Sequence, residues 1–260
     1  MPKSITPATI TAHNKIASDI YDLRLQTQLA QTAQPGQFVG VYPQGAATLL
    51  PRPISICETD SGKGEIRLVY RLAGRGTREF AGYQAGESVC LLGPLGNGFP
   101  LEEAQGQRLA IMGGGIGIPP LLGLAKALAG QTAATDIFLG YRDNQAYLAE
   151  EMQAYGPVHI ASEDGSVGTR GHVLDGLAAT GQTPSLIMAC GPLAMLRAVK
   201  AFAENNAAKA YISLEERMAC GIGACLGCVC RTTAINEHTH VHNARVCTEG
   251  PVFEAGEVKI

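Results

Sequence analysis

Residues 220–247 read CGIGACLGCVCRTTAINEHTHVHNARVC, and this segment holds five of the eight cysteines and three of the six histidines of the chain. Its cysteines follow the spacing Cys220-x4-Cys225-x2-Cys228, with Cys247 further along. That spacing is typical of a plant-type two-iron, two-sulfur cluster, on which four thiolates converge. Glycines between the cysteines let the backbone wrap closely around such a group. Because apolar residues are few here, we expect the segment to fold around metal.

Structural zinc is the alternative for these cysteines, because paired cysteines are common zinc ligands. A zinc site usually has two short ligand pairs, whereas here one loop carries three cysteines, the first two separated by four residues. This spacing favours iron–sulfur over zinc. His238, His240 and His242 alternate along the chain and would lie on one face of a strand. That face could bind metal, but we favour an exposed polar face of a hairpin before Cys247. Cys230 is interpreted as a thiol outside the ligand set.

Composition limits the class of protein. A net charge of -3 and a pI near 6.1 give no electrostatic reason to expect nucleic-acid binding. The N-terminus MPKSITPATITAHNK lacks a signal-peptide pattern. Residues 109–130 are apolar, but prolines and glycines interrupt them, so we expect no membrane span. We therefore expect a cytoplasmic protein whose cysteines are reduced.

The first hundred residues contain several short runs of alternating or β-branched character, separated by Gly, Pro and Asp. These runs lie at 37–42, 54–57, 65–70 and 87–92. Short strands at close spacing predict an antiparallel barrel or sandwich.

Two motifs in this part place an arginine beside a strand and a small hydroxyl residue. They are LLPRPISIC at 49–57 and LVYRLAGRGT at 68–77. A fixed guanidinium suits a pyrophosphate, and the hydroxyl of Ser55 or Thr77 can donate to a phosphate or a flavin ring. Taken singly, each arginine could equally be a solvated surface residue.

From Arg108 the pattern alternates between strands and helices. Strands are predicted at 108–112, 135–141 and 185–190, and helices at 119–130 and 192–206. This alternation predicts an α/β unit with a parallel sheet. Within the second helix, an apolar residue at every third position predicts one buried face; these residues are Leu193, Leu196, Val199 and Phe202. Beyond it, Ser213 and Glu216 fit a helix capping box, although AYISL could equally continue a strand through Ser213.

Two further motifs lie at the ends of predicted strands. MGGGIGIPP at 112–120 is a glycine turn before a helix, where backbone N–H groups bind phosphate, although Ile118 replaces the third glycine of GxGxxG. A tight structural turn is the alternative. ACGPLAML at 189–196 places Cys190 at the carboxyl edge of the sheet, where ligands bind, and core packing is as good an explanation. After the strand predicted at 135–141, Arg142 and Asp143 point to different nucleotides. An arginine suits the 2′-phosphate of NADP, and an aspartate suits the free 2′-hydroxyl of NAD.

The order of these motifs resembles the ferredoxin–NADP reductase superfamily. The motifs that show this resemblance are, in order, RPIS, YR and GT, GGGIG, CGP and the CGIGAC loop. Within it, SLEERMACGIGACLGCVC is similar to the iron–sulfur electron-transfer subunits of dihydroorotate dehydrogenase B, and the resemblance covers essentially the whole chain. It implies an FAD-binding β-barrel at 1–101, a Rossmann-like NAD-binding α/β domain at 102–210 and a small 2Fe–2S domain at 211–260.

The resemblance also implies a set of residues for each cofactor. FAD would be held by Arg52, Pro53, Ile54, Ser55, Val69, Tyr70, Arg71, Gly76 and Thr77. NAD, a diffusible acceptor, would bind at Gly113, Gly114, Gly115, Gly117, Cys190, Gly191 and Pro192. The 2Fe–2S cluster would be ligated by Cys220, Cys225, Cys228 and Cys247.

The implied activity is electron transfer by an NAD-linked oxidoreductase subunit. Electrons would come from an FMN-containing dihydroorotate dehydrogenase catalytic subunit, two of each chain per assembly, and pass through the cluster and FAD to NAD⁺ in de novo pyrimidine (UMP) biosynthesis. No catalytic side chain is predicted, because bound cofactors carry the electrons. One alternative is the reductase subunit of a hydrogenase, sulfide dehydrogenase or ferredoxin:NADP oxidoreductase. Another is a zinc-stabilised nucleotide-binding regulator without redox activity.

Overall fold

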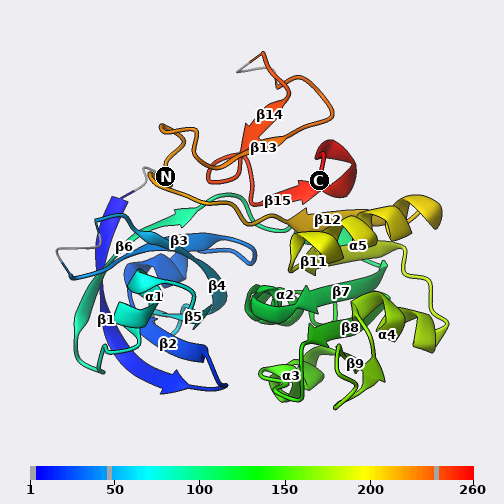
Figure 1. Cartoon of the computed structure of the whole chain (residues 1–260), viewed down its shortest axis with the longest axis horizontal. Coiled ribbons are helices and arrows are strands. Elements are labelled where there is room, and N and C mark those ends of the chain that lie inside the picture. Colours follow the sequence, from blue (N-terminus) through cyan, green and yellow to red (C-terminus); the bar gives the residue numbers. More distant parts are fainter. Residues whose placement is uncertain (1–3, 46–48, 237–239) are drawn as a thin grey trace.

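The computed structural model describes residues 4–45, 49–236 and 240–260. Figure 1 shows a barrel formed by the N-terminal residues (blue to cyan) beside an α/β sheet (green to yellow), with the C-terminal segment (orange to red) lying above both. This arrangement confirms the predicted order of a β part, an α/β part and a small cysteine-containing part.

Six antiparallel strands close the barrel in the order β1-β2-β5-β4-β3-β6. Their bounds are β1 (Ser4–Lys15), β2 (Ile20–Gln26), β3 (Phe38–Tyr42), β4 (Arg52–Asp60), β5 (Glu65–Arg71) and β6 (Ser88–Leu95), with α1 (Arg75–Phe80) after β5. Leu25, Val39, Ile66 and Leu68 fill the interior and are fully buried. The four predicted strands are confirmed as β3 to β6, and the alternative of a sandwich is wrong because the sheet closes on itself.

A seven-stranded sheet forms the centre of the α/β part, with the strand order β10-β9-β8-β7-β11-β12-β15. The strands are β7 (Arg108–Gly114), β8 (Ala134–Tyr141), β9 (Val158–Ser162), β10 (Thr169–Arg170), β11 (Leu186–Cys190), β12 (Lys209–Ser213) and β15 (Val252–Glu254). All neighbouring strands are parallel except β12 and β15. Because β8 lies on one side of β7 and β11 on the other, the strand order reverses at β7, and ligands bind at such a switch point in open α/β sheets.

Helices cover both faces of this sheet. They are α2 (Pro119–Leu128), α3 (Ala149–Met152), α4 (Val173–Thr180) and α5 (Leu193–Asn205), with short 3-10 turns at Gln28–Gln31, Leu101–Ala104, Gly115–Gly117, Gln153–Tyr155 and Ala255–Glu257. α2 and α3 pack in one hydrophobic cluster, and α4 and α5 pack in another on the opposite face. The predicted strands and both predicted helices are confirmed. The predicted burial of Leu193 is wrong: its side chain is 46% exposed, because the first turn of α5 extends past the sheet.

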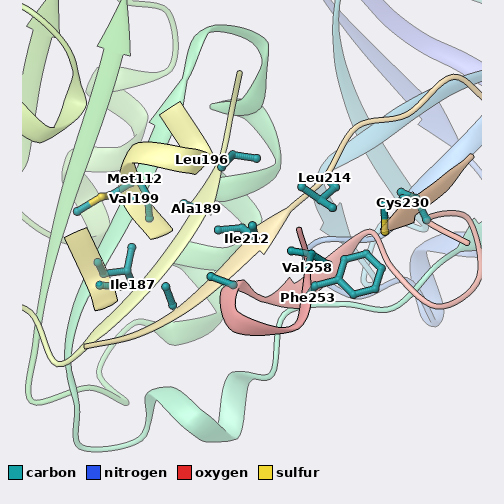
Figure 2. Close-up of a cluster of buried hydrophobic side chains, with 14 of the residues drawn as sticks. Met112, Ile187, Ala189, Leu196, Val199, Ile212, Leu214, Cys230, Phe253 and Val258 are labelled. Atoms are coloured by element: carbon teal, nitrogen blue, oxygen red, sulfur yellow. The ribbon is translucent and has the colours of Figure 1, made fainter. Parts of the chain in front are cut away.

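The C-terminal segment is joined to both other parts by one continuous core. Its hairpin is formed by β13 (Val229–Arg231) and β14 (Asn243–Arg245), and β15 then adds an edge strand beside β12. Figure 2 shows Ile212, Leu214, Phe253 and Cys230 within the buried cluster that begins at α5. Phe38, Leu92 and Leu95 of the barrel belong to the same cluster. The cysteine segment is therefore packed against both the barrel and the α/β sheet.

Two sequence interpretations of this region are settled by the backbone. β12 runs through Ser213 and residues 214–218 form no helix, so the capping box is wrong and the alternative of a continued strand is confirmed. His240 has φ +56 at a bend before β14, so the prediction of a histidine strand face is wrong at this position. His238 lies outside the described residues. Within the described ranges, no helix is long and apolar enough to cross a membrane.

Candidate functional site

The four cysteines of the spacing motif are brought together in two pairs. The backbone N–H of Cys225 donates to Sγ of Cys220, and the N–H of Cys247 donates to Sγ of Cys228, each at 3.4 Å. The N–H of Gly227 donates to Sγ of Cys225, also at 3.4 Å. Within the described ranges, no three His, Cys, Asp or Glu groups gather around the position of one metal ion. The sulfurs instead form pairs approached by backbone N–H groups.

The electrostatics of this loop differ between its cysteines. Burial raises the pKa of Cys220, but the backbone N–H groups of Ile222, Cys225 and Ala224 outweigh it and lower that pKa to about 6. Burial and the neighbouring Cys228 raise the pKa of Cys247 to about 11. Backbone N–H groups directed at sulfur favour the charged form, which is the form that binds iron. The donor set therefore fits an iron–sulfur cluster.

The loop has a buried side and an exposed side. Cys228 and Cys247 are buried, whereas Cys225 is exposed, and the neighbouring Leu226 is 61% exposed. Gly221 has φ +67, a backbone conformation that favours glycine, and a Cβ there would lie 3.1 Å from Leu95 of the barrel. The loop therefore rests on β6 of the barrel and presents its opposite edge to solvent.

Cys230 lies in the core. It pairs with Ala244 in the β13–β14 hairpin, and burial raises its pKa to about 11. Its interpretation as a thiol outside the ligand set stays a prediction.

The two arginine motifs of the barrel meet in space. A Cβ on Gly76 would lie 2.5 Å from Nε of Arg52, so the guanidinium lies directly over the glycine at the start of α1. Nη1 of Arg52 donates to the carbonyl of Leu50 at 2.8 Å. The hydroxyl of Thr77 accepts hydrogen bonds from the N–H groups of Ala73 and Gly74 and so shapes the turn itself. A guanidinium over a turn without a side chain fits a pyrophosphate, as FAD requires.

Other residues of the predicted FAD set differ in exposure. Val69 and Tyr70 are 3% and 2% exposed, and Tyr70 OH lies 2.9 Å from Nε2 of His13 inside the barrel. Their side chains therefore belong to the core, and only their backbone can reach a ligand. Pro53 is exposed on β4 with Ile54 and Ser55 half-buried beside it, and Arg71 is exposed at the end of β5.

A cleft of about 720 Å³ lies between the barrel and the carboxyl edge of the parallel sheet. This volume is in the range of small-molecule sites. Of the seven residues predicted for NAD, Gly114, Gly115 and Pro192 line the cleft. The other four lie behind its wall; they are Gly113, Gly117, Cys190 and Gly191. A Cβ on Gly117 would lie 2.4 Å from the carbonyl oxygen of Cys190, so the absence of a side chain at Gly117 lets the glycine turn pack against the end of β11.

The cleft also contains Arg71, which was predicted for FAD, and residues that sequence reasoning missed. The barrel contributes residues 17–20, and the sheet side contributes Tyr147, Glu163 and His172. The hydroxyl of Tyr147 donates to the carbonyl of Gly115 at 2.6 Å, and burial raises the pKa of this tyrosine. Tyr147 and Glu163 lie in connections between elements, where no motif marked them. One signal could have indicated Glu163: it is an acidic residue directly after β9, at the edge of the sheet where nucleotides bind.

Comparisons with known proteins were made for the whole chain. Residues 215–259 match the family model described as the iron–sulfur cluster binding domain of dihydroorotate dehydrogenase B. The chain is 45% identical over 254 residues to the dihydroorotate dehydrogenase B (NAD(+)) electron transfer subunit of Bacillus cereus (strain B4264), covering 96% of each protein.

Solved structures agree on the fold. An NADH-dependent reduced ferredoxin–NADP oxidoreductase matches with a TM-score of 0.85 and 25% identity, over 97% of this chain and 89% of that one. A ferredoxin NADP⁺ reductase from Neisseria gonorrhoeae with bound FAD and NADP matches with a TM-score of 0.65 and 14% identity, over 78% and 91%.

The barrel, the glycine turn at the switch point of the sheet and the cysteine loop define an iron–sulfur flavoprotein oxidoreductase of the ferredoxin–NADP reductase type. The identity over nearly the full length narrows this class further. The chain belongs to the family of dihydroorotate dehydrogenase B (NAD(+)) electron transfer subunits.

Proposed function

We propose that the chain transfers electrons from the FMN-containing catalytic subunit of a dihydroorotate dehydrogenase to NAD⁺, in de novo pyrimidine (UMP) biosynthesis. Membership of the family supports this function. The observation that carries it is the central place of the barrel. Its Arg71 lines the cleft, and its Leu95 contacts the cysteine loop through Gly221. A flavin held by the barrel therefore has the nicotinamide cleft on one side and the cysteine loop on another.

The residues of the chain have separate tasks in this function. FAD, when bound, can exchange a hydride with a nicotinamide and single electrons with an iron–sulfur cluster, which is the conversion that the function requires. Arg52 over Gly76 is proposed to bind the FAD pyrophosphate. Gly114, Gly115 and Pro192 are proposed to leave room for the nicotinamide dinucleotide. Backbone N–H groups stabilise negative charge on the sulfurs of Cys220, Cys225 and Cys228.

The partner is proposed to dock at the exposed edge of the cysteine loop. Leu226 and Ile222 are 61% and 49% exposed there, and Cys225 lies between them. One-electron transfer requires proximity, so this edge suits the catalytic subunit. We propose two copies of each subunit per assembly. We also propose a cytoplasmic location, where all eight cysteines, free in this structure, would stay reduced.

The division into an FAD part at 1–101, an NAD part at 102–210 and a cluster part at 211–260 remains our proposal. β15 from the last part extends the sheet of the second. We therefore expect the second and third parts to unfold together.

Two alternatives are less well supported. A subunit of a ferredoxin:NADP oxidoreductase shares the fold, but that likeness is 25% identical, against 45% for the dihydroorotate dehydrogenase relative. A zinc-stabilised regulator without redox activity finds no support in the comparisons.

The test is an absorption spectrum of anaerobically purified protein, recorded before and after NADH, with iron, sulfide and flavin assayed in the same sample. We expect flavin and iron–sulfur bands that bleach with NADH. Dihydroorotate should bleach them only after the catalytic subunit is added. A colourless, zinc-containing protein would refute the proposal.

A further inference from the structure

Residues 143–152 belong to the connection between β8 and β9. They contact the barrel and form one wall of the cleft. Asp143, Gln145 and Tyr147 all line the cleft. Oε1 of Gln145 accepts a hydrogen bond from the backbone N–H of Ser18, at 2.6 Å, so the wall contacts the barrel at its beginning. We call residues 143–152 the cleft wall.

Tyr147 is the innermost part of the cleft wall. Its hydroxyl donates to the carbonyl of Gly115, in the glycine turn, and its own carbonyl accepts from the hydroxyl of Tyr141 at 2.8 Å. The two tyrosine rings meet edge to face at 5.5 Å. The position of Tyr147 therefore sets both the width of the cleft and the placement of the glycine turn.

The residue after Tyr147 has an unfavourable backbone conformation. Leu148 has φ +64, and its side chain is 7% exposed. A left-handed conformation is costly for a leucine, so surrounding contacts must maintain it. The contacts of the cleft wall with the barrel are suited to this task.

The strongest of these contacts joins Glu151 to Arg67 of β5. Nη1 of Arg67 lies 2.5 Å from Oε2 of Glu151, and Nη2 lies 3.0 Å from Oε1, which is a two-pronged pair. Arg67 is 5% exposed, and its Nε donates to both carboxylate oxygens of Asp22 at 3.1 and 3.0 Å. Because Asp22 fixes the guanidinium on the outer face of the barrel, it offers Glu151 a rigid point of attachment.

We propose that Arg67 is a positioning residue for nicotinamide binding. Through Glu151 it holds the cleft wall, and the wall holds Tyr147 against the glycine turn. This inference rests on the proposed function, because it takes the cleft to be the NAD site. Arg67 itself does not line the cleft, so its effect on NAD is transmitted through the wall.

An ion pair elsewhere in the α/β part provides a matched control. Nζ of Lys209 in β12 lies 2.9 Å from Oε1 of Glu103, and neither residue lines the cleft or pairs with Arg67 or Glu151. Loss of this pair removes one ion pair and leaves the cleft wall attached. Lys209→Met should therefore leave NAD⁺ binding unchanged.

The experiment measures the Kd for NAD⁺ by calorimetry, on protein carrying its flavin and iron in full. Glu151→Gln keeps the shape of the side chain and removes its charge. It should raise the Kd about fivefold, the effect of losing one ion pair of ordinary strength. Tyr147→Phe should raise it too. The double variant should bind NAD⁺ no more weakly than the weaker single variant, because both changes release the same wall.

Three results would overturn the inference. They are a Glu151→Gln protein that binds NAD⁺ as the wild type does, an equal loss in Lys209→Met, and effects of Glu151→Gln and Tyr147→Phe that simply add. A wild-type protein that binds no NAD⁺ would instead refute the proposed function of the cleft.

Discussion

The backbone N–H of Cys247 donates to Sγ of Cys228, although the two residues lie 19 positions apart in the sequence. The β13–β14 hairpin produces this contact, since its strands pair Cys230 with Ala244 and so return the chain to the loop. The distant fourth cysteine of the motif thus lies beside the third.

The cysteine pairs lead to the first prediction. Cys225→Ser and Cys247→Ser should each lose the cluster, because a hydroxyl is a poor substitute for a thiolate ligand of iron. Iron and acid-labile sulfide per chain are the measurements. Cys230→Ala should keep both, since Cys230 lies in the core of the hairpin. Equal loss of iron in Cys230→Ala would mean that the ligand set is misassigned.

The second prediction concerns FAD. Arg52→Ala should weaken FAD retention, because it removes the guanidinium that lies over Gly76. Gly76→Ala should do the same by displacing that guanidinium, whose Nε would be 2.5 Å from the new Cβ. Flavin remaining after extensive dialysis is the measurement, and Lys63→Ala, on an exposed turn, is the control. Full flavin occupancy in both test variants would count against the site.

The third prediction concerns the close approach of the glycine turn to the end of β11. Gly117→Ala should destabilise the protein by about 3 kcal/mol, because overpacking against fixed backbone cannot be relieved by a side-chain movement. The new Cβ would lie 2.4 Å from the carbonyl oxygen of Cys190. Thermal unfolding measures the effect. Gly62→Ala is the control, since the nearest atom to its Cβ would be Oδ1 of Asp60 at 3.4 Å. Equal unfolding temperatures would show that the turn can open.

The fourth prediction concerns pH. The hydrogen bond from Arg67 lowers the pKa of Glu151 below its ordinary value of 4.5. A lowered pKa in the folded state contributes stability above the ordinary pKa, and that stability is lost as pH falls through the folded pKa. The wild type should therefore unfold at a higher temperature than Glu151→Gln at pH 7, and the difference should shrink below pH 4.5. A difference that persists at pH 3 would contradict this origin.

The fifth prediction concerns the choice between NAD and NADP. Glu163 lines the cleft and makes no side-chain hydrogen bond or ion pair within the described residues, whereas Asp164 accepts from Ser166 and Asp143 accepts from Gln145. A free carboxylate can accept from a ribose 2′-hydroxyl and repels a 2′-phosphate. Glu163→Arg changes the local charge by two units and should therefore raise kcat/KM for NADPH relative to NADH by about tenfold, which corresponds to about 1.4 kcal/mol.

The matched control for that change is Glu204→Arg, which makes the same change of charge at an exposed position on α5, outside the cleft and the cleft wall. Its ratio of NADPH to NADH activity should equal that of the wild type. An unchanged ratio in Glu163→Arg would place the adenosine ribose elsewhere.

Much of the fold could be predicted from local patterns. The apolar run of β7, the glycine turn and the proline-initiated α2 were predicted in the right order, because each is encoded by neighbouring residues. β1 and β2 were missed, since β1 is rich in Thr and in exposed positions and carries a weak apolar signal. The histidine alternation was misleading because period 2 alone cannot tell a strand from an irregular loop.

The residues of the candidate site also fall into those that local motifs predicted and those that only tertiary contacts reveal. Sequence motifs supplied Gly114, Gly115 and Pro192, which line the cleft. They could not supply Tyr147 or Glu151, whose roles depend on contacts with Gly115 and Arg67. Such contacts connect positions far apart in the chain, and no local pattern records them.

By itself, the sequence determined the type of cluster, the order of the three parts and the motifs for each cofactor, because ligand spacing and turn residues act over short stretches of chain. Only the tertiary structure decided that Arg52 lies over Gly76, that Cys247 lies beside Cys228 and that the barrel closes one side of the cleft. The physical reason is that these relationships arise from packing between segments distant in sequence. Closure of the barrel and the shared core, rather than local propensity, fix where those segments meet.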